Sequence, residues 1–404
     1  MVTRRRVIYV PGYDPRGLAH YYRLFRTEAQ QFCRLYGVNA TVSKIERPDN
    51  RRSAHWTIKT AGDRWAVDTI YEFLRWEDIV QSDFARPMWW KVLHAFKSIG
   101  IILADGTLAK IVRAHWRFGG FIAYPFLCFL LYILAACALG MAAFSLTALV
   151  APGFPLPALA GIVVAAAAFV LIARSAEPYT YVLYMFVDTA ATHEFVCRCR
   201  PDWEERLQLF ATYVVEAANK NDADEIVIVG HSSGSFLAVE VLDRALALDP
   251  NLGLHGPRVV LLTVGANLPI VGFHPRAQWF RDRLRRLGAE ATVDWIDYQS
   301  RKDIMSFYPF DPIAGHGIDL GSRRTNPHVV PVRFRDIISP EWYRRFRWRF
   351  FRVHFQFIMA NERPAHYDYF MIVCGPFYLR YRAERPNEVV AAVTKTRALQ
   401  AAAE

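Results

Sequence analysis

The chain has 404 residues, more than a single hydrophobic core usually supports, so we expect two domains or one large domain with an insertion. Hydrophobic residues make up 53% of the chain and charged residues 22%, which indicates that the apolar excess is concentrated in one region. The net charge of +11 comes with no nucleic-acid-binding signature, and we therefore expect anionic lipid instead of nucleic acid as the partner.

The N-terminal part of the chain predicts strands and helices in turn. Residues 6–10 form a short β-branched run, a loop with two prolines and two glycines follows, and residues 18–36 have a helical pattern. Only six strand-like residues follow the basic start of the chain, so no secretory signal is predicted. Further strand-like segments, ahead of an amphipathic stretch at 78–118, are 38–45, 56–60 and 68–74.

A long stretch without charge separates the two halves of the chain. Between Arg117 and Arg174 there are 56 residues without Asp, Glu, Lys, Arg or His. One bilayer crossing takes about 20 apolar residues, so this stretch predicts two transmembrane helices, at 121–150 and 156–173. The turn between them, 151–157, contains prolines and a glycine. We expect a helical hairpin inserted into the fold, not a helix pair buried in a soluble core.

The flanks of this hairpin indicate its orientation. Positive charges lie at its outer ends and none in its turn, so both outer ends and the soluble parts are expected on the cytoplasmic side of a bacterial-type inner membrane. The flanking cations are Lys110, Arg113, Arg117 and Arg174. Two basic and aromatic stretches, 89–97 and 343–352, are expected at lipid headgroups, with solvated helix faces as the alternative.

Beyond the hairpin, strands and helices alternate, which predicts a parallel sheet. Strands are expected at 179–187, 225–229, 258–264, 292–298 and 328–334. Helices are expected at 202–219, 235–248 and 275–287, with a last helix or a frayed tail after Asn387. We therefore predict one α/β domain in two parts, 1–110 and 179–404, around a membrane segment at 111–178.

The cysteine pattern indicates free thiols. The chain has six cysteines, of which Cys197 and Cys199 are too close for an easy disulfide, and two others lie in the predicted hairpin. None has the CxxC spacing of a zinc or redox site, so no cysteine-based metal site is expected.

The segment Ile226-Val-Ile-Val-Gly-His-Ser-Ser-Gly234 contains a GxSxG motif between an apolar strand and a helix-forming run. A serine hydroxyl is a poor nucleophile unless a base takes its proton and the side chain is held toward the substrate. Gly230 and Gly234 lack Cβ atoms and permit a sharp turn that exposes Ser232. The next helix points its N-terminal N–H groups at developing negative charge, so Ser233 N–H is expected as one oxyanion donor.

Together with Val7-Ile-Tyr-Val-Pro-Gly-Tyr13, this segment resembles the α/β-hydrolase superfamily, especially its lipase-like and serine esterase members. The resemblance covers both soluble parts and leaves out the hairpin. It implies a mostly parallel α/β-hydrolase sheet with flanking helices, and the chain order serine, acid, histidine. The second oxyanion donor in this superfamily commonly comes from a His-Gly pair after an early strand. Here Pro11-Gly12-Tyr13 occupies that place without the histidine, and Tyr13 N–H is the expected donor.

Asp303 is the expected acid of the triad. It lies in a loop just past the strand predicted at 292–298, where the acid of this superfamily belongs. A salt bridge with a neighbouring cation is its alternative role. Other aspartates fit less well because they lie within the strand or farther along the chain: Asp294, Asp297 and Asp311.

Two histidines after the last strand, His354 and His366, are candidates for the base. His354 is preferred because it lies among aromatic residues, an unusual place for an imidazole without a partner. His366 follows a turn, where a purely structural role explains it more easily. His231 is adjacent to Ser232, but neighbouring side chains on such a turn point apart, so it is expected to line the acyl pocket or to pack.

These expectations describe a membrane-anchored serine hydrolase that cleaves a lipid-like or membrane-partitioned ester through an acyl-enzyme on Ser232. The chemistry needs neither a metal nor an organic cofactor. Because the hairpin is inserted within the fold, the site is expected near the bilayer surface. Two alternatives stay open: an inactive scaffold or binding protein with the same fold, and an acyltransferase or thioesterase that uses the same serine.

Overall fold

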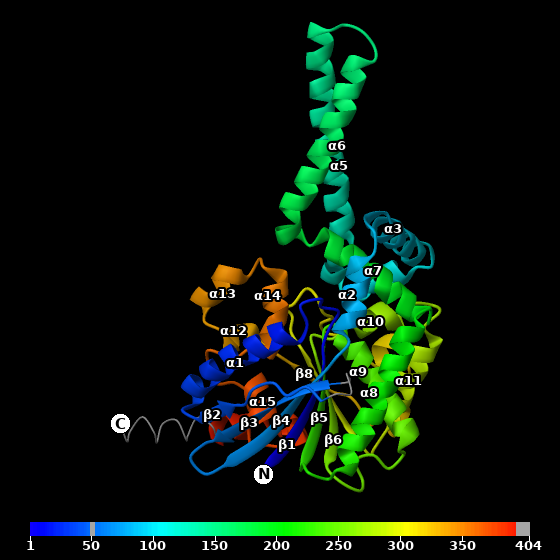
Figure 1. The fold of residues 1–404 in the computed structure, drawn as a ribbon. Helices are drawn as coiled ribbons and strands as arrows, with labels where there is room; N and C mark the ends of the chain where they lie inside the picture. The colour runs from blue at the N-terminus through cyan, green and yellow to red at the C-terminus, as the bar shows by residue number, and fades with distance from the viewer. Residues whose placement is uncertain (49–52, 393–404) are drawn as a thin grey trace.

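A single sheet organises the fold. In the computed structural model residues 1–48 and 53–392 are described, and they form eight strands with helices on both faces (Figure 1). In chain order the strands are β1 (Arg4–Val10), β2 (Asn39–Val42), β3 (Ser53–Ala61), β4 (Ala66–Leu74), β5 (Glu225–His231), β6 (Arg258–Val264), β7 (Asp294–Gln299) and β8 (His328–Pro331). Their order across the sheet is β2-β3-β4-β1-β5-β6-β7-β8, antiparallel from β2 to β4 and parallel from β4 to β8. The predicted α/β class is confirmed, with a mixed sheet.

Each of the eight strands lies in a segment where the sequence predicts one, and all except β6 have shifted ends. A ninth predicted strand, 179–187, is wrong, because these residues end helix α6 (Leu156–Thr180) and begin α7 (Val182–Val196). The segment is rich in aromatic and β-branched residues, which favour strands. Val182 and Phe186 nevertheless lie four residues apart, on one helical face, and both are buried in a cluster with neighbouring helices. Tertiary packing therefore outweighs local propensity here.

Two helical layers cover the sheet because strand side chains alternate between its faces. On β1, Val7 and Tyr9 face one layer, whereas Ile8 and Val10 face the other. The first layer holds α1 (Gly17–Tyr36), α12 (Phe334–Ile337), α13 (Pro340–Phe346), α14 (Phe350–Phe355), α15 (Tyr369–Cys374) and α16 (Leu379–Glu384). The second layer holds α8 (Pro201–Asn219), α9 (Gly234–Leu248), α10 (Leu268–Gly272) and α11 (Gln278–Ala289).

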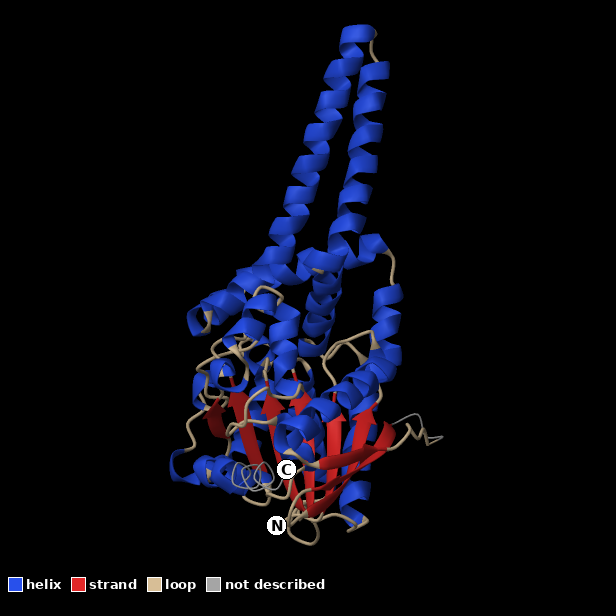
Figure 2. Cartoon of the chain, turned by 90° about the vertical axis from the view of Figure 1, so that its left-hand side faces the viewer, coloured by secondary structure: helices blue, strands red, loops and turns tan. Residues whose placement is uncertain are grey.

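A cap of helices lies between the sheet and the hairpin. It consists of α7 and three helices from the stretch predicted to be amphipathic: α2 (Glu77–Ala85), α3 (Met88–Ala104) and α4 (Thr107–Ala114). Helix α3 packs on α7 and α4, so it belongs to the cap although its residues lie in the predicted first part of the sheet domain. Figure 2 shows the parallel strands pointing toward this cap. The carboxyl ends of the strands, where ligand sites of α/β sheets lie, are therefore covered.

The hairpin consists of α5 (Trp116–Val150) and α6, which are long and apolar enough to cross a membrane. Their most apolar windows have mean hydropathies of 2.4 and 2.6, and only 11% of each window is buried inside the protein. Both helices extend beyond the predicted spans of 121–150 and 156–173. Among the described residues, the bent pair α3 and α4, with 76° between the helices, is a further candidate if it forms one span.

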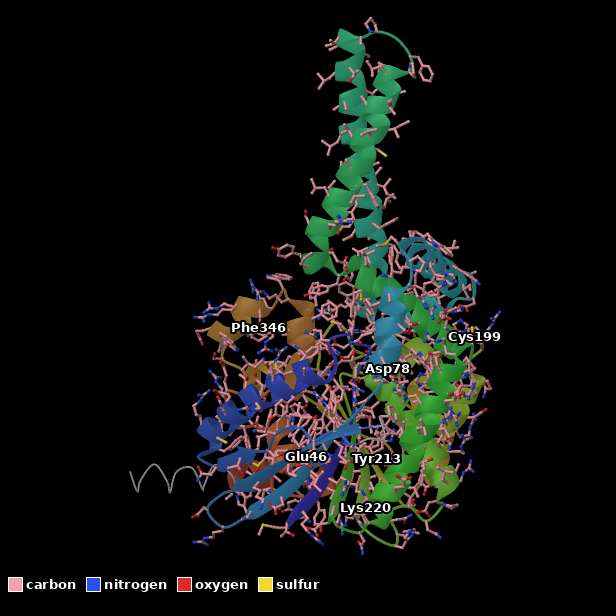
Figure 3. All side chains as sticks on the ribbon, in the orientation of Figure 1. Glu46, Asp78, Cys199, Tyr213, Lys220 and Phe346 are labelled. Atoms are coloured by element: carbon pink, nitrogen blue, oxygen red, sulfur yellow. The ribbon has the colours of Figure 1, made fainter. Side chains whose placement is uncertain are left out.

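Small residues bring the two hairpin helices together. A Cβ on Gly140 would lie 2.7 Å from the Gly161 carbonyl oxygen, and a Cβ on Gly161 would lie 3.0 Å from the Gly140 carbonyl oxygen. Close backbone approach of this kind suits helix pairs in lipid, where packing instead of the hydrophobic effect drives association. Side chains along the hairpin are almost wholly hydrocarbon, in contrast to the nitrogen and oxygen atoms that cover the sheet domain (Figure 3).

The six cysteines are free thiols, as the sequence predicts. Residues 386–392 are helical, which agrees with the last helix that the sequence offers as one alternative for the tail after Asn387. The rest of that tail, 393–404, lies outside the described residues.

Candidate active site

Strand β5 runs into helix α9 through a tight turn at Ser232. Ser232 has a φ of 59°, in the left-handed region that costs a residue with a side chain about 1–2 kcal/mol. This conformation at a strand-to-helix junction is the one that holds a nucleophile out from the edge of a sheet. Ser232 accordingly lines a cavity between the sheet and the cap.

Glycines make room for the turn. A Cβ on Gly230 would lie 2.7 Å from the Gly234 carbonyl oxygen, and a Cβ on Gly234 would overlap the carbonyl oxygen of Val10. The loop after β1 also lies against the turn, since a Cβ on Gly12 would be 3.2 Å from Ser232 Cβ. Any side chain at Gly230 or Gly234 would push β5, α9 and the loop after β1 apart.

Asp303 and His354 form a buried pair. Asp303 lies in the loop after β7, His354 lies on α14, and His354 Nδ1 donates to Asp303 Oδ2 over 2.7 Å. The side chains are 0% and 2% exposed, so the bond is shielded from water. Asp303 Oδ1 accepts from the Met305 N–H over 3.0 Å, which holds the carboxylate in place. A proton on Nδ1 leaves Nε2 of a neutral imidazole as the acceptor.

His354 Nε2 is buried and has no hydrogen-bond partner in the described part of the chain. His354 lines the same cavity as Ser232, but no hydrogen bond joins the two side chains among the described residues. The contact of Ser232 Oγ is instead a long one, 3.5 Å, from Asn267 Nδ2. Serine–histidine bonds of catalytic sites are often long without substrate, so this arrangement is compatible with a base at His354.

Two neighbours position the imidazole of His354. Gly265 has a φ of +56°, and a Cβ there would lie 2.8 Å from His354 Cε1, so only glycine leaves room for the ring. The ring of His231 stacks on that of His354 at 4.6 Å and 27°. Burial, together with the nearby His354, lowers the pKa of His231 well below its usual value, so His231 packs as a neutral ring. His231 also lines the cavity.

The two expected oxyanion donors border the same cavity. Ser233 directly precedes α9, and Tyr13 lies in the loop after β1. In the described residues neither backbone N–H donates to a protein acceptor. The Tyr13 side chain is turned to Asp83 on α2, to which its hydroxyl donates over 2.8 Å, so this loop is fastened while its N–H stays available.

The remaining candidates from the sequence lie elsewhere. His366 Nε2 donates to the Pro331 carbonyl oxygen over 2.9 Å, and His366 is not among the residues that line the cavity in the described part of the chain. Asp297 accepts from Thr263 and Gln299 within the sheet, and burial raises its pKa to about 6. The other two aspartates pair with arginines away from the cavity: Asp294 with Arg380 and Asp311 with Arg324.

The cavity has a volume of about 340 Å³ and a largely apolar wall toward the hairpin. That wall comes from α4, the start of α5 and α7, with Ile111, Phe118, Phe121 and Met185 in one buried cluster. An acyl chain or another hydrophobic group fits such a surface. Sequence reasoning does not identify these residues, because they lie in segments that are far from the motif along the chain.

Polar residues that the sequence analysis leaves out also line the cavity. Asn267 follows β6 at the carboxyl edge of the sheet, a position that could have singled it out. Asp188 lies on α7, in the neighbourhood of the segment wrongly predicted as a strand. Burial raises its pKa to about 7, and no described residue compensates its charge. The cavity therefore contains a carboxyl group whose surroundings disfavour its charged form.

Within the described residues, no group of three or more His, Cys, Asp or Glu side chains is arranged to hold a metal ion. Comparison of the chain with protein-family models, curated proteins and solved structures gave no match.

Proposed function

We propose that the protein is a membrane-anchored serine hydrolase of the esterase or lipase type, with Ser232 as nucleophile, His354 as base and Asp303 as acid. The observation that carries the proposal is the buried hydrogen bond between Asp303 and His354. His354 lines the same cavity as Ser232, whose backbone has the left-handed conformation. A buried carboxylate that holds one imidazole nitrogen, with the other nitrogen unpaired, is the arrangement of a general base.

In the proposed reaction Ser232 Oγ attacks the ester carbonyl carbon while its proton passes to His354 Nε2. The N–H groups of Tyr13 and Ser233 stabilise the negative oxygen of the tetrahedral intermediate. Collapse breaks the bond to the alcohol, which leaves with the proton from His354, and Ser232 keeps the acyl group. Water then attacks the carbonyl carbon of the acyl-enzyme while its proton passes to His354. The bond to Ser232 Oγ breaks, Ser232 takes the proton back from His354, and the acid is released.

The substrate that we propose is a lipid-like ester that partitions into the bilayer. The apolar cavity wall favours a hydrophobic acyl group, and residues at the start of the hairpin helix α5 form part of that wall. Tryptophans suited to lipid headgroups are exposed on the cap, at the start of α5 and between α13 and α14: Trp89 (65%), Trp116 (69%) and Trp348 (75%). We place the sheet domain on the cytoplasmic side of a bacterial-type inner membrane, because the cations flank the outer ends of the hairpin.

The first experiment uses the full chain in detergent with p-nitrophenyl butyrate and a fluorophosphonate probe. We expect hydrolysis by the wild type, and a loss in Ser232→Ala of at least about 10⁴-fold in kcat, since no other group replaces the nucleophile. Mass spectrometry is expected to locate the probe on Ser232. Ser322→Ala, at an exposed serine in the short 3-10 helix Gly321–Arg323 ahead of β8, is the matched control and should keep the wild-type rate.

The other outcomes separate the alternatives. Equal rates in wild type and Ser232→Ala would exclude Ser232 as the nucleophile. A folded protein that never reacts with the probe would favour a non-catalytic scaffold. Probe labelling without release of acid, but with transfer of the acyl group to an added thiol or alcohol, would favour an acyltransferase.

A further inference from the structure

A second cavity, of about 770 Å³, lies at the base of the hairpin. Helices α5 and α6 form one side of it, and α2, α3 and α7 contribute the rest of its wall. Most side chains from the hairpin are apolar, among them Phe129, Phe169 and Ala173, and α6 adds the charged Arg174 and Glu177. This basal groove, as we call it, therefore lies in the part of the molecule that meets the hydrocarbon layer if the hairpin spans a membrane.

The basal groove and the catalytic cavity share part of their walls. Tyr181 and Tyr184 line both, and they are the residues that the two linings have in common within the described part of the chain. Their rings contact Phe351 on α14, with centroids at 4.6 Å for Tyr181 and 5.6 Å for Tyr184. This aromatic group therefore lies where the linings of the two spaces meet.

The backbone at this group is a strained break between helices. Tyr181 has a φ of 52°, which costs a residue with a side chain about 1–2 kcal/mol. The Glu177 carboxylate accepts from the N–H groups of Leu183 at 3.0 Å and Tyr184 at 3.2 Å, and so stabilises the new helix start. The hairpin therefore ends in a fixed corner whose aromatic side chains separate groove and cavity.

The same group contacts the catalytic machinery. The Tyr184 hydroxyl donates to the carbonyl oxygen of Tyr13, the residue whose N–H is the proposed oxyanion donor. Phe351 lies on α14, three residues before His354. A substrate that displaces these rings would thus press on the loop after β1, which contains Tyr13, and on α14, which contains His354.

We propose that the basal groove binds the acyl chain of a bilayer lipid ester, and that the chain reaches Ser232 from the membrane by passing between Tyr181 and Tyr184. This inference rests on the proposed serine hydrolase function. A lipid chain is the occupant because most of the hairpin wall is apolar and because the groove shares the lining residues Tyr181 and Tyr184 with the catalytic cavity. Arg174, an exposed cation in the lining of the groove, suits the phosphate of an anionic headgroup.

The test compares two esters with one leaving group, 4-methylumbelliferyl acetate in water and 4-methylumbelliferyl oleate in vesicles of phosphatidylethanolamine and phosphatidylglycerol. Ala173→Trp fills the groove from α6 without touching the catalytic cavity. We expect it to lower oleate hydrolysis at least about tenfold while acetate hydrolysis stays within about twofold of wild type. Ala167→Trp, exposed on the same helix and outside the groove, is the control and should leave both rates unchanged.

Oleate hydrolysis at the wild-type rate in Ala173→Trp would overturn the inference. A second measurement applies even if that variant misfolds: the wild type is irradiated in vesicles with phosphatidylglycerol that carries a diazirine on its acyl chain. Crosslinks concentrated at groove residues such as Phe129 and Phe169 support the site, and even labelling along the whole hairpin refutes it. Occupancy of the groove does not depend on Ser232, so groove crosslinks without probe labelling of Ser232 would refute the hydrolase function alone.

Discussion

The bond between Asp303 and His354 is the contact on which the proposed chemistry depends most. The two residues lie 51 positions apart and meet only because the loop after β7 and helix α14 converge beside the turn at Ser232. In Asp303→Asn an amide of the same shape replaces the carboxylate. The amide NH₂ can donate a hydrogen bond to His354 Nδ1, whereas a carboxylate can only accept one. The wrong tautomer then places a proton on Nε2, which no longer accepts one from Ser232.

We therefore expect Asp303→Asn to lower kcat for p-nitrophenyl butyrate by about 10³–10⁴-fold with little change in KM. The measurement is steady-state kinetics, with thermal unfolding as the check on folding. Asp311→Asn, which keeps its bonds to the N–H groups of Ile313 and Ala314 outside the cavity, is the matched control. An activity of Asp303→Asn close to that of the control would remove Asp303 from the mechanism.

Asp188 makes the stability of the fold depend on pH. Its pKa is about 7 in the folded chain, against an ordinary value of 3.8, because burial disfavours its charge. Between about pH 4 and pH 7 the folded state therefore keeps a proton that the unfolded chain releases. The folded state binds more protons in this window, so stability falls as pH rises through it.

Asp188→Asn removes this effect. Between pH 5 and pH 8 we expect the free energy of unfolding to fall by about 1–2 kcal/mol more in the wild type than in the variant. The difference is smaller than the full pKa shift implies because Asp188 is only partly buried. Thermal unfolding followed by tryptophan fluorescence at both pH values measures the difference. Parallel pH dependence in the two proteins would mean that Asp188 ionises normally.

At the scale of the elements, the hairpin depends on close helix contact at Gly140 and Gly161. A side chain at Gly140 would meet the Gly161 carbonyl oxygen and the Ala165 Cβ, both at 2.7 Å, and neither can move without separating the helices. Gly120 lies on the same helix, and a Cβ added there would have no described atom within 4 Å, so the two glycines form a matched pair.

Gly140→Leu should destabilise the protein in detergent by about 1–3 kcal/mol, the usual cost of overpacking. Gly120→Leu should be neutral or slightly stabilising, because glycine is a poor helix former. Thermal unfolding of the two variants beside the wild type tests the prediction. Equal melting temperatures would show that the helices do not depend on this contact.

The whole molecule has two chemically different ends. The hairpin tip carries Phe154, which is 90% exposed, and the sheet domain carries the exposed Cys199, which Figure 3 labels far from the tip. If the hairpin spans the membrane and the cations at its outer ends face the cytoplasm, the two sites lie on opposite sides of the bilayer. Two single-cysteine variants can report this, one with only Cys199 and one with only Phe154→Cys.

In intact bacterial cells a membrane-impermeant maleimide should label the cysteine at position 154 and spare Cys199 until the membrane is permeabilised. The reverse pattern would invert the proposed orientation. Labelling of both sites in intact cells would mean that the hairpin does not separate them by a membrane.

The sequence by itself determined the features that depend on local pattern. Eight strand positions follow from apolar runs, because a buried strand needs hydrophobic residues wherever it lies in the sheet. The two long helices follow from the absence of charge between Arg117 and Arg174, and the turn at Ser232 from the glycines around it. Each of these signals is contained within a short segment, so no knowledge of distant contacts is needed.

Only the tertiary structure decided what depends on residues far apart along the chain. Sequence left His354 and His366 as alternatives, and the structure brings His354 to Asp303 and leaves His366 outside the cavity. Asp188 and the wall formed by Tyr181 and Tyr184 were not predicted, because their segment has strand propensity and becomes helical through packing on α3 and α5. A cavity is made by several elements at once, so no single segment carries its signal.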